Sequence, residues 1–98
     1  MELTSKQRRW LRGQAHGLDA LVQVGKSGLS DGLIRQTDEV LGRHELIKVR
    51  FLADRDDRRE QTAALVAAAG AQLAGAIGRV AILYRQHADP EKRRYKMP

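Results

Sequence analysis

Two glycines and a lysine form a Gly-x-x-Gly loop, Gly25-Lys26-Ser27-Gly28, between an apolar segment and a polar one. Ser30 follows at a position where its hydroxyl can cap a helix by accepting a hydrogen bond from a backbone N–H. Glycines let the backbone turn without side chains. Free N–H groups at the positive end of a helix dipole, next to a lysine, favour phosphate. We therefore expect this loop to contact a nucleic-acid backbone.

The same loop partly matches the nucleotide-binding Walker A motif, G-x-x-x-x-G-K-[ST]. Gly25-Lys26-Ser27 fits its last three positions, but Ala20 stands where the first glycine is required. Residues 21–24 are apolar and predict a strand, which leaves no glycine-rich cradle for a triphosphate. We interpret the loop as a backbone contact and not as an NTPase site.

The charge balance favours an anionic partner, either nucleic acid or an acidic membrane surface. The 98 residues carry a formal net charge of +6, and 31% of them are charged. The absence of cysteine excludes disulfides, zinc-thiolate fingers and thiol catalysis. The N-terminus has no apolar secretion signal, and residues 63–77 are too polar to span a bilayer. We expect a cytoplasmic protein with no membrane role.

No group of residues predicts catalysis. His44-Glu45-Leu46-Ile47-Lys48 starts like the zinc-protease motif H-E-x-x-H, but Lys48 replaces the second histidine and the segment predicts a strand. The three histidines are widely spaced and lack a nucleophile partner. Asp54, Asp56 and Asp57 fit the start of a helix better than a cation site. We predict no enzyme activity, no catalytic residue, no metal, no cofactor and no small-molecule substrate.

The first helix is expected to start at Thr4, which forms a capping-box pattern with Gln7. On its wheel, Trp10, Leu11, Ala15 and Leu18 fall on one side and Arg8, Arg9, Arg12 and His16 on another. The basic side has no acidic residue to pair with its arginines, whereas an inert exposed face typically alternates in sign. We interpret it, together with Lys6, as a binding surface, with a solvated face as the alternative. Trp10 is either core packing or a base-stacking platform.

Periodicity and turn residues predict the remaining elements. They are a strand at 21–24, a helix at about 31–42, a strand at 46–52, a helix that follows the loop 53–57 and ends at Gly70, and a hairpin of strands 72–77 and 80–85. The order α-β-α-β-α-β-β predicts a two-layer α/β domain with a mixed four-stranded sheet. In the second strand, Lys48 and Arg50 alternate with apolar residues and make one face basic. We expect one domain over residues 1–86 and a basic, flexible tail over 87–98.

With these motifs in place, the chain resembles the CRM domain family (chloroplast RNA splicing and ribosome maturation), and most closely its stand-alone bacterial, YhbY-like members. The matching segments are LTSKQRRWLRGQAH, VQVGKSGLSDGLI, HELIKVRF and IGRVAILYR. The resemblance implies a fold similar to the C-terminal domain of bacterial initiation factor three. It also implies a glycine loop comparable to that of KH domains, which clamps nucleic-acid backbone. Bacterial members bind structured RNA and are associated with assembly of the large ribosomal subunit.

Together these arguments predict a monomeric, non-catalytic RNA-binding protein that acts on ribosomal RNA in large-subunit precursors. The residues expected to contact RNA are Gly25, Lys26, Ser27, Gly28 and Ser30 of the loop, Lys6, Arg8, Arg9 and Arg12 of the first helix, and Lys48 and Arg50 of the second strand. Two alternatives use the same basic surface. One is a nonspecific DNA-binding or nucleoid protein, and the other is a protein-interaction module on ribosomal particles.

Overall fold

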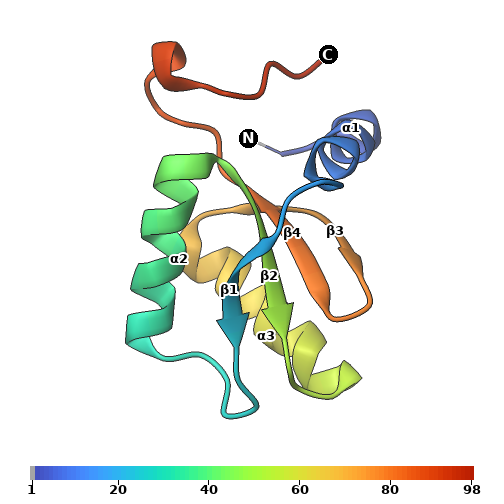
Figure 1. The fold of residues 1–98 in the computed structure, drawn as a ribbon, viewed down its shortest axis with the longest axis vertical. Helices are drawn as coiled ribbons and strands as arrows, with labels where there is room; N and C mark the ends of the chain where they lie inside the picture. The colour runs from blue at the N-terminus through green and yellow to red at the C-terminus, as the bar shows by residue number, and fades with distance from the viewer. Residues whose placement is uncertain (1) are drawn as a thin grey trace.

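Three helices pack on a four-stranded sheet in the computed structural model, which describes residues 2–98 (Figure 1). The elements are α1 (Ser5–Ala15), β1 (Ala20–Val24), α2 (Asp31–His44), β2 (Leu46–Phe51), α3 (Arg55–Ala69), β3 (Gln72–Ile77), β4 (Val80–Tyr84) and a 3-10 turn at Pro90–Lys92. The strand order is β1-β2-β4-β3, with β1 parallel to β2 and the other pairs antiparallel. The predicted fold class, element order and mixed sheet are confirmed.

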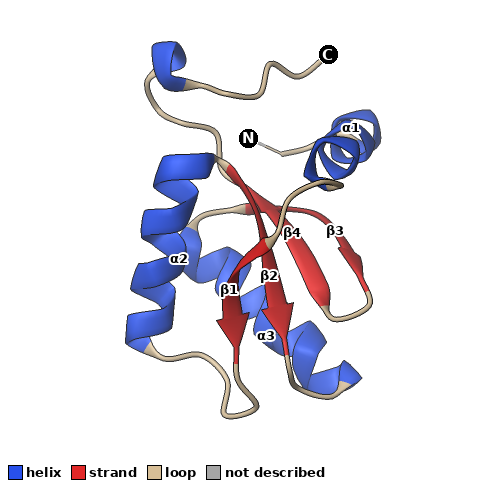
Figure 2. Cartoon of the chain, in the orientation of Figure 1, coloured by secondary structure: helices blue, strands red, loops and turns tan. Residues whose placement is uncertain are grey.

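Both faces of the sheet carry helices (Figure 2), and each face contributes apolar residues to a core. On the face covered by α2 and α3, which we call the back face, Ile47 and Val49 of β2 share a core with Leu41 of α2 and Leu65 of α3. On the opposite, front face, the sheet and α1 form a second core. It contains Leu11 and Ala15 of α1 together with Leu46, Ala74, Ile82 and Tyr84 of the sheet. The two expected layers are therefore the sheet and the helices α2 and α3 on its back face. The apolar front-face residues at one end of the sheet also need cover, and α1 supplies it as a third layer.

Local capping signals fix the helix starts. Thr4 and Gln7 form both hydrogen bonds of the predicted capping box, at 3.0 and 3.1 Å. The helix α2 runs to His44, two residues past the predicted end, and stops where Glu45 takes a left-handed φ of 62°. The helix α3 starts at Arg55, inside the predicted loop 53–57, with Asp54 as its N-cap. Within residues 2–98, no helix combines the length and apolar character needed to cross a membrane.

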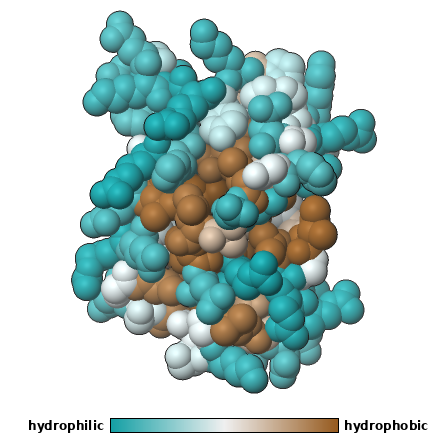
Figure 3. Space-filling view, viewed as in Figure 1, coloured by the Kyte–Doolittle hydropathy of each residue, from teal (hydrophilic) through white to brown (hydrophobic). Residues whose placement is uncertain are grey.

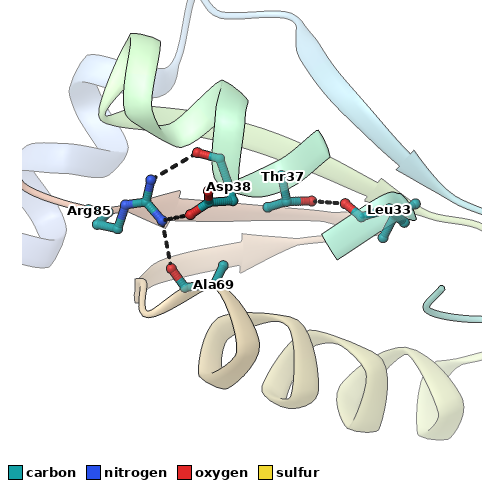
Figure 4. Close-up of polar contacts among 5 residues, drawn as sticks. All are labelled: Leu33, Thr37, Asp38, Ala69 and Arg85. Carbon is teal, nitrogen blue, oxygen red and sulfur yellow. Dashed lines mark hydrogen bonds and ion pairs between the residues drawn. The ribbon is translucent and has the colours of Figure 1, made fainter. Parts of the chain in front are cut away.

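Arg85 joins both back-face helices to the end of β4 (Figure 4). Its Nη1 donates to Asp38 Oδ1 at 2.6 Å and to the carbonyl oxygen of Ala69 at 2.8 Å, and its Nη2 donates to the carbonyl oxygen of Asp38 at 2.8 Å. Nearby in α2, the buried Thr37 hydroxyl donates to the Leu33 carbonyl at 2.9 Å. Arg85 is therefore committed to holding α2, α3 and the sheet together.

Residues 87–98, expected as a flexible tail, lie against the domain at the end where α1 packs (Figure 1). The Glu45 side chain is only 1% exposed. Its Oε2 accepts a hydrogen bond from the His87 N–H at 2.7 Å, and its Oε1 accepts one from the Arg94 N–H. The ring of Tyr95 meets that of Trp10 edge-on, with centroids 6.4 Å apart. Trp10 is half-buried in this contact.

Candidate nucleic-acid interface

The Gly-x-x-Gly loop leaves several backbone donors free. It closes on itself through one hydrogen bond, from the Gly28 N–H to the Gly25 carbonyl at 3.0 Å. The Ser30 hydroxyl oxygen accepts from the Leu33 N–H at 3.1 Å, which confirms the predicted cap of α2. The N–H groups of Lys26, Ser27, Leu29 and Ser30 have no acceptor within residues 2–98. These donors surround the start of a 14-residue helix, where the dipole favours an anion.

The two loop glycines are needed for different reasons. Gly28 has a φ of 91°, and a Cβ there would lie 3.3 Å from Nε2 of Gln61 in α3. Gly25 has no positive φ, and a Cβ on it would meet nothing within 4 Å. The fold therefore requires glycine at position 28 but not at 25. At Gly25 the missing side chain leaves open space beside the free N–H groups.

Gln61 supports this loop and carries no signal in the sequence. Its side-chain Oε1 is buried and has no hydrogen-bond partner, and its Nε2 lies under Gly28. The two residues come from different elements, and no local pattern relates them. The sequence alone therefore does not indicate that Gln61 lies beside the loop.

The basic residues of α1 divide into two pairs. Lys6 and Arg9 are exposed, and neither donates a side-chain hydrogen bond within residues 2–98. Arg8 donates to the Leu3 carbonyl at 2.6 Å and to the Ser5 hydroxyl at 3.1 Å. Arg12 donates to the Ala74 carbonyl of β3 at 3.0 Å and is half-buried. Arg8 and Arg12 thus have structural partners, whereas Lys6 and Arg9 face solvent.

Lys48 and Arg50 lie on the front face between α1 and the loop. The Lys48 Nζ donates to the carbonyl oxygen of His16 at 3.3 Å, just past the end of α1. Arg50 is exposed and pairs in register with Gln23, one residue before the end of β1. β1 lies between the end of α1 and the loop in the chain and spans roughly 13 Å from its first to its last residue, at about 3.3 Å per residue. The predicted residues are therefore spread over α1, β2 and the loop and do not form one cluster; we call Lys6, Arg9, Lys48 and Arg50 the track.

Most of these cations have no carboxylate partner within 4.0 Å in residues 2–98. Within residues 2–98 the one ion pair closer than 4.0 Å joins Arg85 to Asp38. The positive charges of Lys6, Arg9, Lys26 and Arg50 consequently have no carboxylate partner in the described part of the chain. An unneutralised row of this kind is the electrostatic footprint of a polyanion-binding surface.

The acidic residues of the described chain are dispersed or have structural roles. Among residues 2–98 no cluster of three or more histidine or carboxylate side chains could hold a metal ion. Asp54 caps α3 without a side-chain hydrogen bond, and Asp56 and Asp57 occupy its first turn, where negative charge complements the helix dipole. Glu45, from the protease-like segment, is buried against backbone donors of residues 87–98.

Comparison with known proteins identifies the family of this chain. The sequence pattern of the CRS1/YhbY (CRM) domain matches residues 3–85. The chain belongs to this family. The predicted resemblance is confirmed, and the matched range includes every residue of the track and the loop.

Relatives of this CRM-domain protein carry names that refer to RNA. The chain is 39% identical over 97 residues to "Probable RNA-binding protein YqeI" of Bacillus subtilis, covering 98% of this chain and 99% of that protein. It is 37% identical over 93 residues to "Probable RNA-binding protein PA4753" of Pseudomonas aeruginosa, covering 94% and 89%. The solution structure of the hypothetical protein SAV1595 from Staphylococcus aureus matches with a TM-score of 0.83 and 36% identity, covering 98% of this chain and 99% of that one.

Proposed function

We propose that this CRM-domain protein is a non-catalytic RNA-binding protein that binds the phosphate backbone of structured RNA. The observation that carries the proposal is the set of unsatisfied N–H groups in the Gly25–Gly28 loop, next to Lys26 and at the start of α2. The relatives in Bacillus subtilis and Pseudomonas aeruginosa are named as probable RNA-binding proteins, which supports the same conclusion.

In this mechanism the loop and the track bind different phosphates of the RNA. The free N–H groups of the loop and the Lys26 ammonium hold one or two phosphates. Arg50, Lys48 and the exposed residues of α1, Lys6 and Arg9, take further phosphates along the front face. Such contacts follow the shape and charge of the RNA and carry little sequence information.

In this proposal Arg8 and Arg12 also contact RNA, in addition to their hydrogen bonds within the domain. Each guanidinium has five N–H donors, so the hydrogen bonds they make within the domain leave others free. Arg12 also joins α1, which carries Lys6 and Arg9, to β3. We therefore keep them in the interface, as residues that combine positioning with charge.

The binding mechanism is tested by affinity as a function of salt. If about six phosphates are neutralised, a plot of log affinity against log salt has a slope of about −4 to −5. Lys26→Glu weakens binding to every structured RNA to a similar degree and leaves the fold intact. Arg43→Glu is the matched control, because Arg43 is also exposed but lies in the last turn of α2, about 20 Å from the loop. Equal affinity of the Lys26→Glu variant and the wild type contradicts the loop mechanism.

We further propose that the protein acts as a cytoplasmic monomer on ribosomal RNA in precursors of the large ribosomal subunit. Gradient sedimentation of a cell extract, with and without ribonuclease, tests this role. Co-migration with large-subunit precursors that ribonuclease abolishes supports it. Co-migration that survives ribonuclease indicates a protein-interaction module instead, and equal competition by duplex DNA and folded RNA indicates a nonspecific DNA-binding protein.

A further inference from the structure

We infer that the open half of the front sheet face is a subsite for unpaired nucleotides of the bound RNA. This inference rests on the proposed function and specifies the class of RNA: a structured element with a single-stranded segment beside it. It adds base contacts to the phosphate contacts described above.

The front face is only partly covered. The core beneath α1 ends near Ile82, and the sheet beyond it has no helix on this side. Ile77 is 70% exposed there, and Val80 is half-buried. Figure 3 shows hydrophobic residues at the centre of this view of the molecule, bordered and interrupted by hydrophilic ones. An apolar surface with this exposure is accessible to a ligand.

This surface is hollowed. A depression of about 400 Å³ is lined by the apolar side chains of Leu18, Ile77, Val80 and Ile82, which we call its floor, and by the polar side chains of Lys48, Arg50, Asp19 and His16, which we call its rim. Its volume lies in the range of small-molecule pockets, about 300 to 1,000 Å³. An apolar floor beside two cations fits one or two nucleotides, with the base on the floor and the phosphate on the rim.

The two cations can serve both parts of a nucleotide. The Arg50 guanidinium is exposed and has no side-chain partner in residues 2–98, so it can stack on a base or form a fork of hydrogen bonds to a phosphate. The Lys48 ammonium donates one hydrogen bond to His16, which holds it at the rim and leaves two donors. Asp19 also lines the hollow, so the rim carries two positive charges against one negative.

The position of the hollow requires unpaired RNA. It lies between α1 and the loop, on the same front-face track as Lys48 and Arg50. In an A-form duplex the bases are stacked and paired, and a narrow major groove shields their edges. A base can reach the floor of the hollow only if it is unstacked. A duplex held by the loop would therefore place its neighbouring single strand, and not its own bases, in this subsite.

The experiment compares two RNA hairpins with the same stem, one blunt and one with a single-stranded extension of four nucleotides. The wild type is expected to bind the extended hairpin about tenfold more tightly, because one unpaired base then buries apolar surface on the floor of the hollow and can stack on the Arg50 guanidinium. Ile77→Ser is expected to remove most of this preference without changing affinity for the blunt hairpin. Leu73→Ser is the matched control, because Leu73 is 40% exposed on the same strand but lines a groove on the opposite face.

Each outcome decides between specific alternatives. Failure to bind either hairpin at low salt refutes the proposed function itself. Equal binding of both hairpins by the wild type, or equal loss with Ile77→Ser and Leu73→Ser, refutes the subsite alone. If Ile77→Ser instead abolishes a concentration-dependent dimer seen by sedimentation equilibrium, the hollow is an interface between two copies of the chain, and the subsite is again refuted.

Discussion

The guanidinium of Arg12 donates a hydrogen bond to the carbonyl oxygen of Ala74 at 3.0 Å, linking α1 to the edge strand β3 across 62 residues of sequence. Ala74 lies at a register shift between Leu73 and Gly75 and has no partner residue in β4. The side chain of Arg12 also covers Gly75, where a Cβ would lie 2.5 Å from its Cδ. A charged residue over an edge strand satisfies the backbone and hinders pairing with other chains.

This relationship predicts different roles for two neighbouring arginines. Arg12→Ala is expected to lower the free energy of unfolding by about 1–2 kcal/mol, because it removes a hydrogen bond and apolar packing from the edge strand. Arg9→Ala is expected to leave stability nearly unchanged and to reduce the salt slope of RNA binding by about one. Urea unfolding followed by Trp10 fluorescence and a salt titration of affinity measure the two effects. Equal stability of both variants would contradict the structural role of Arg12.

The helix wheel could not separate these two arginines. It correctly placed Leu11 and Ala15 toward the core, because that distinction depends only on the 3.6-residue period. It gave no information on which side chain would reach Ala74, because the contact depends on how α1 lies across the sheet. The caps at Thr4 and Ser30 were predictable for the opposite reason, since each joins residues three positions apart.

The two loop glycines give a second prediction, which separates folding from binding. Gly28→Ala is expected to lower the free energy of unfolding by about 1–2 kcal/mol, because its left-handed backbone disfavours a Cβ and Gln61 lies in the way. Gly25→Ala is expected to leave the folded domain as stable as the wild type or slightly more stable, since alanine restricts the unfolded chain. Thermal unfolding monitored by circular dichroism compares the two variants.

The same Gly25→Ala variant tests the use of the open space at this glycine. A methyl group there stands beside the free N–H groups, so affinity for structured RNA is expected to fall several-fold while stability is retained. A stable Gly25→Ala variant with wild-type affinity would show that the phosphate does not approach the loop at this residue.

Residues 87–98 show a second limit of the sequence. Proline and basic residues favoured a flexible tail, and the one regular element in the segment is the 3-10 turn at Pro90–Lys92. The carboxylate that binds the segment is Glu45, more than forty residues earlier, and its partners are backbone N–H groups. Backbone donors are present at almost every residue, so no side-chain pattern could identify these ones.

Glu45→Gln provides the third prediction. The amide keeps one acceptor oxygen where the carboxylate has two, so one of the bonds to His87 and Arg94 is lost and the other is no longer charge-assisted. We expect a loss of about 1.5–3 kcal/mol in the free energy of unfolding and faster cleavage of residues 87–98 by trypsin. Deleting residues 93–98 should make the two Glu45 forms more nearly equal in stability. An unchanged difference after the deletion would contradict the role of Glu45 as an anchor for this segment.

Tyr84 gives the last prediction, a dependence of stability on alkaline pH. Burial of its ring raises the phenol pKa above the ordinary value of 10.0, the negative charge of Glu45 raises it further, and Arg93 and Gln86 lower it slightly. Because the folded state holds the proton more tightly than the unfolded state, ionisation of this group does not affect the free energy of unfolding below about pH 10 and lowers it as the pH rises toward the folded pKa. Its Oη is buried, and no group among residues 2–98, Gln86 included, meets the geometry of a hydrogen bond to it. Tyr84→Phe is therefore expected to be about 1 kcal/mol more stable at pH 7 and to lose less stability between about pH 9.5 and 11. Urea unfolding at both ends of that range measures this difference, and an equally steep alkaline loss in the variant would show that another group is responsible.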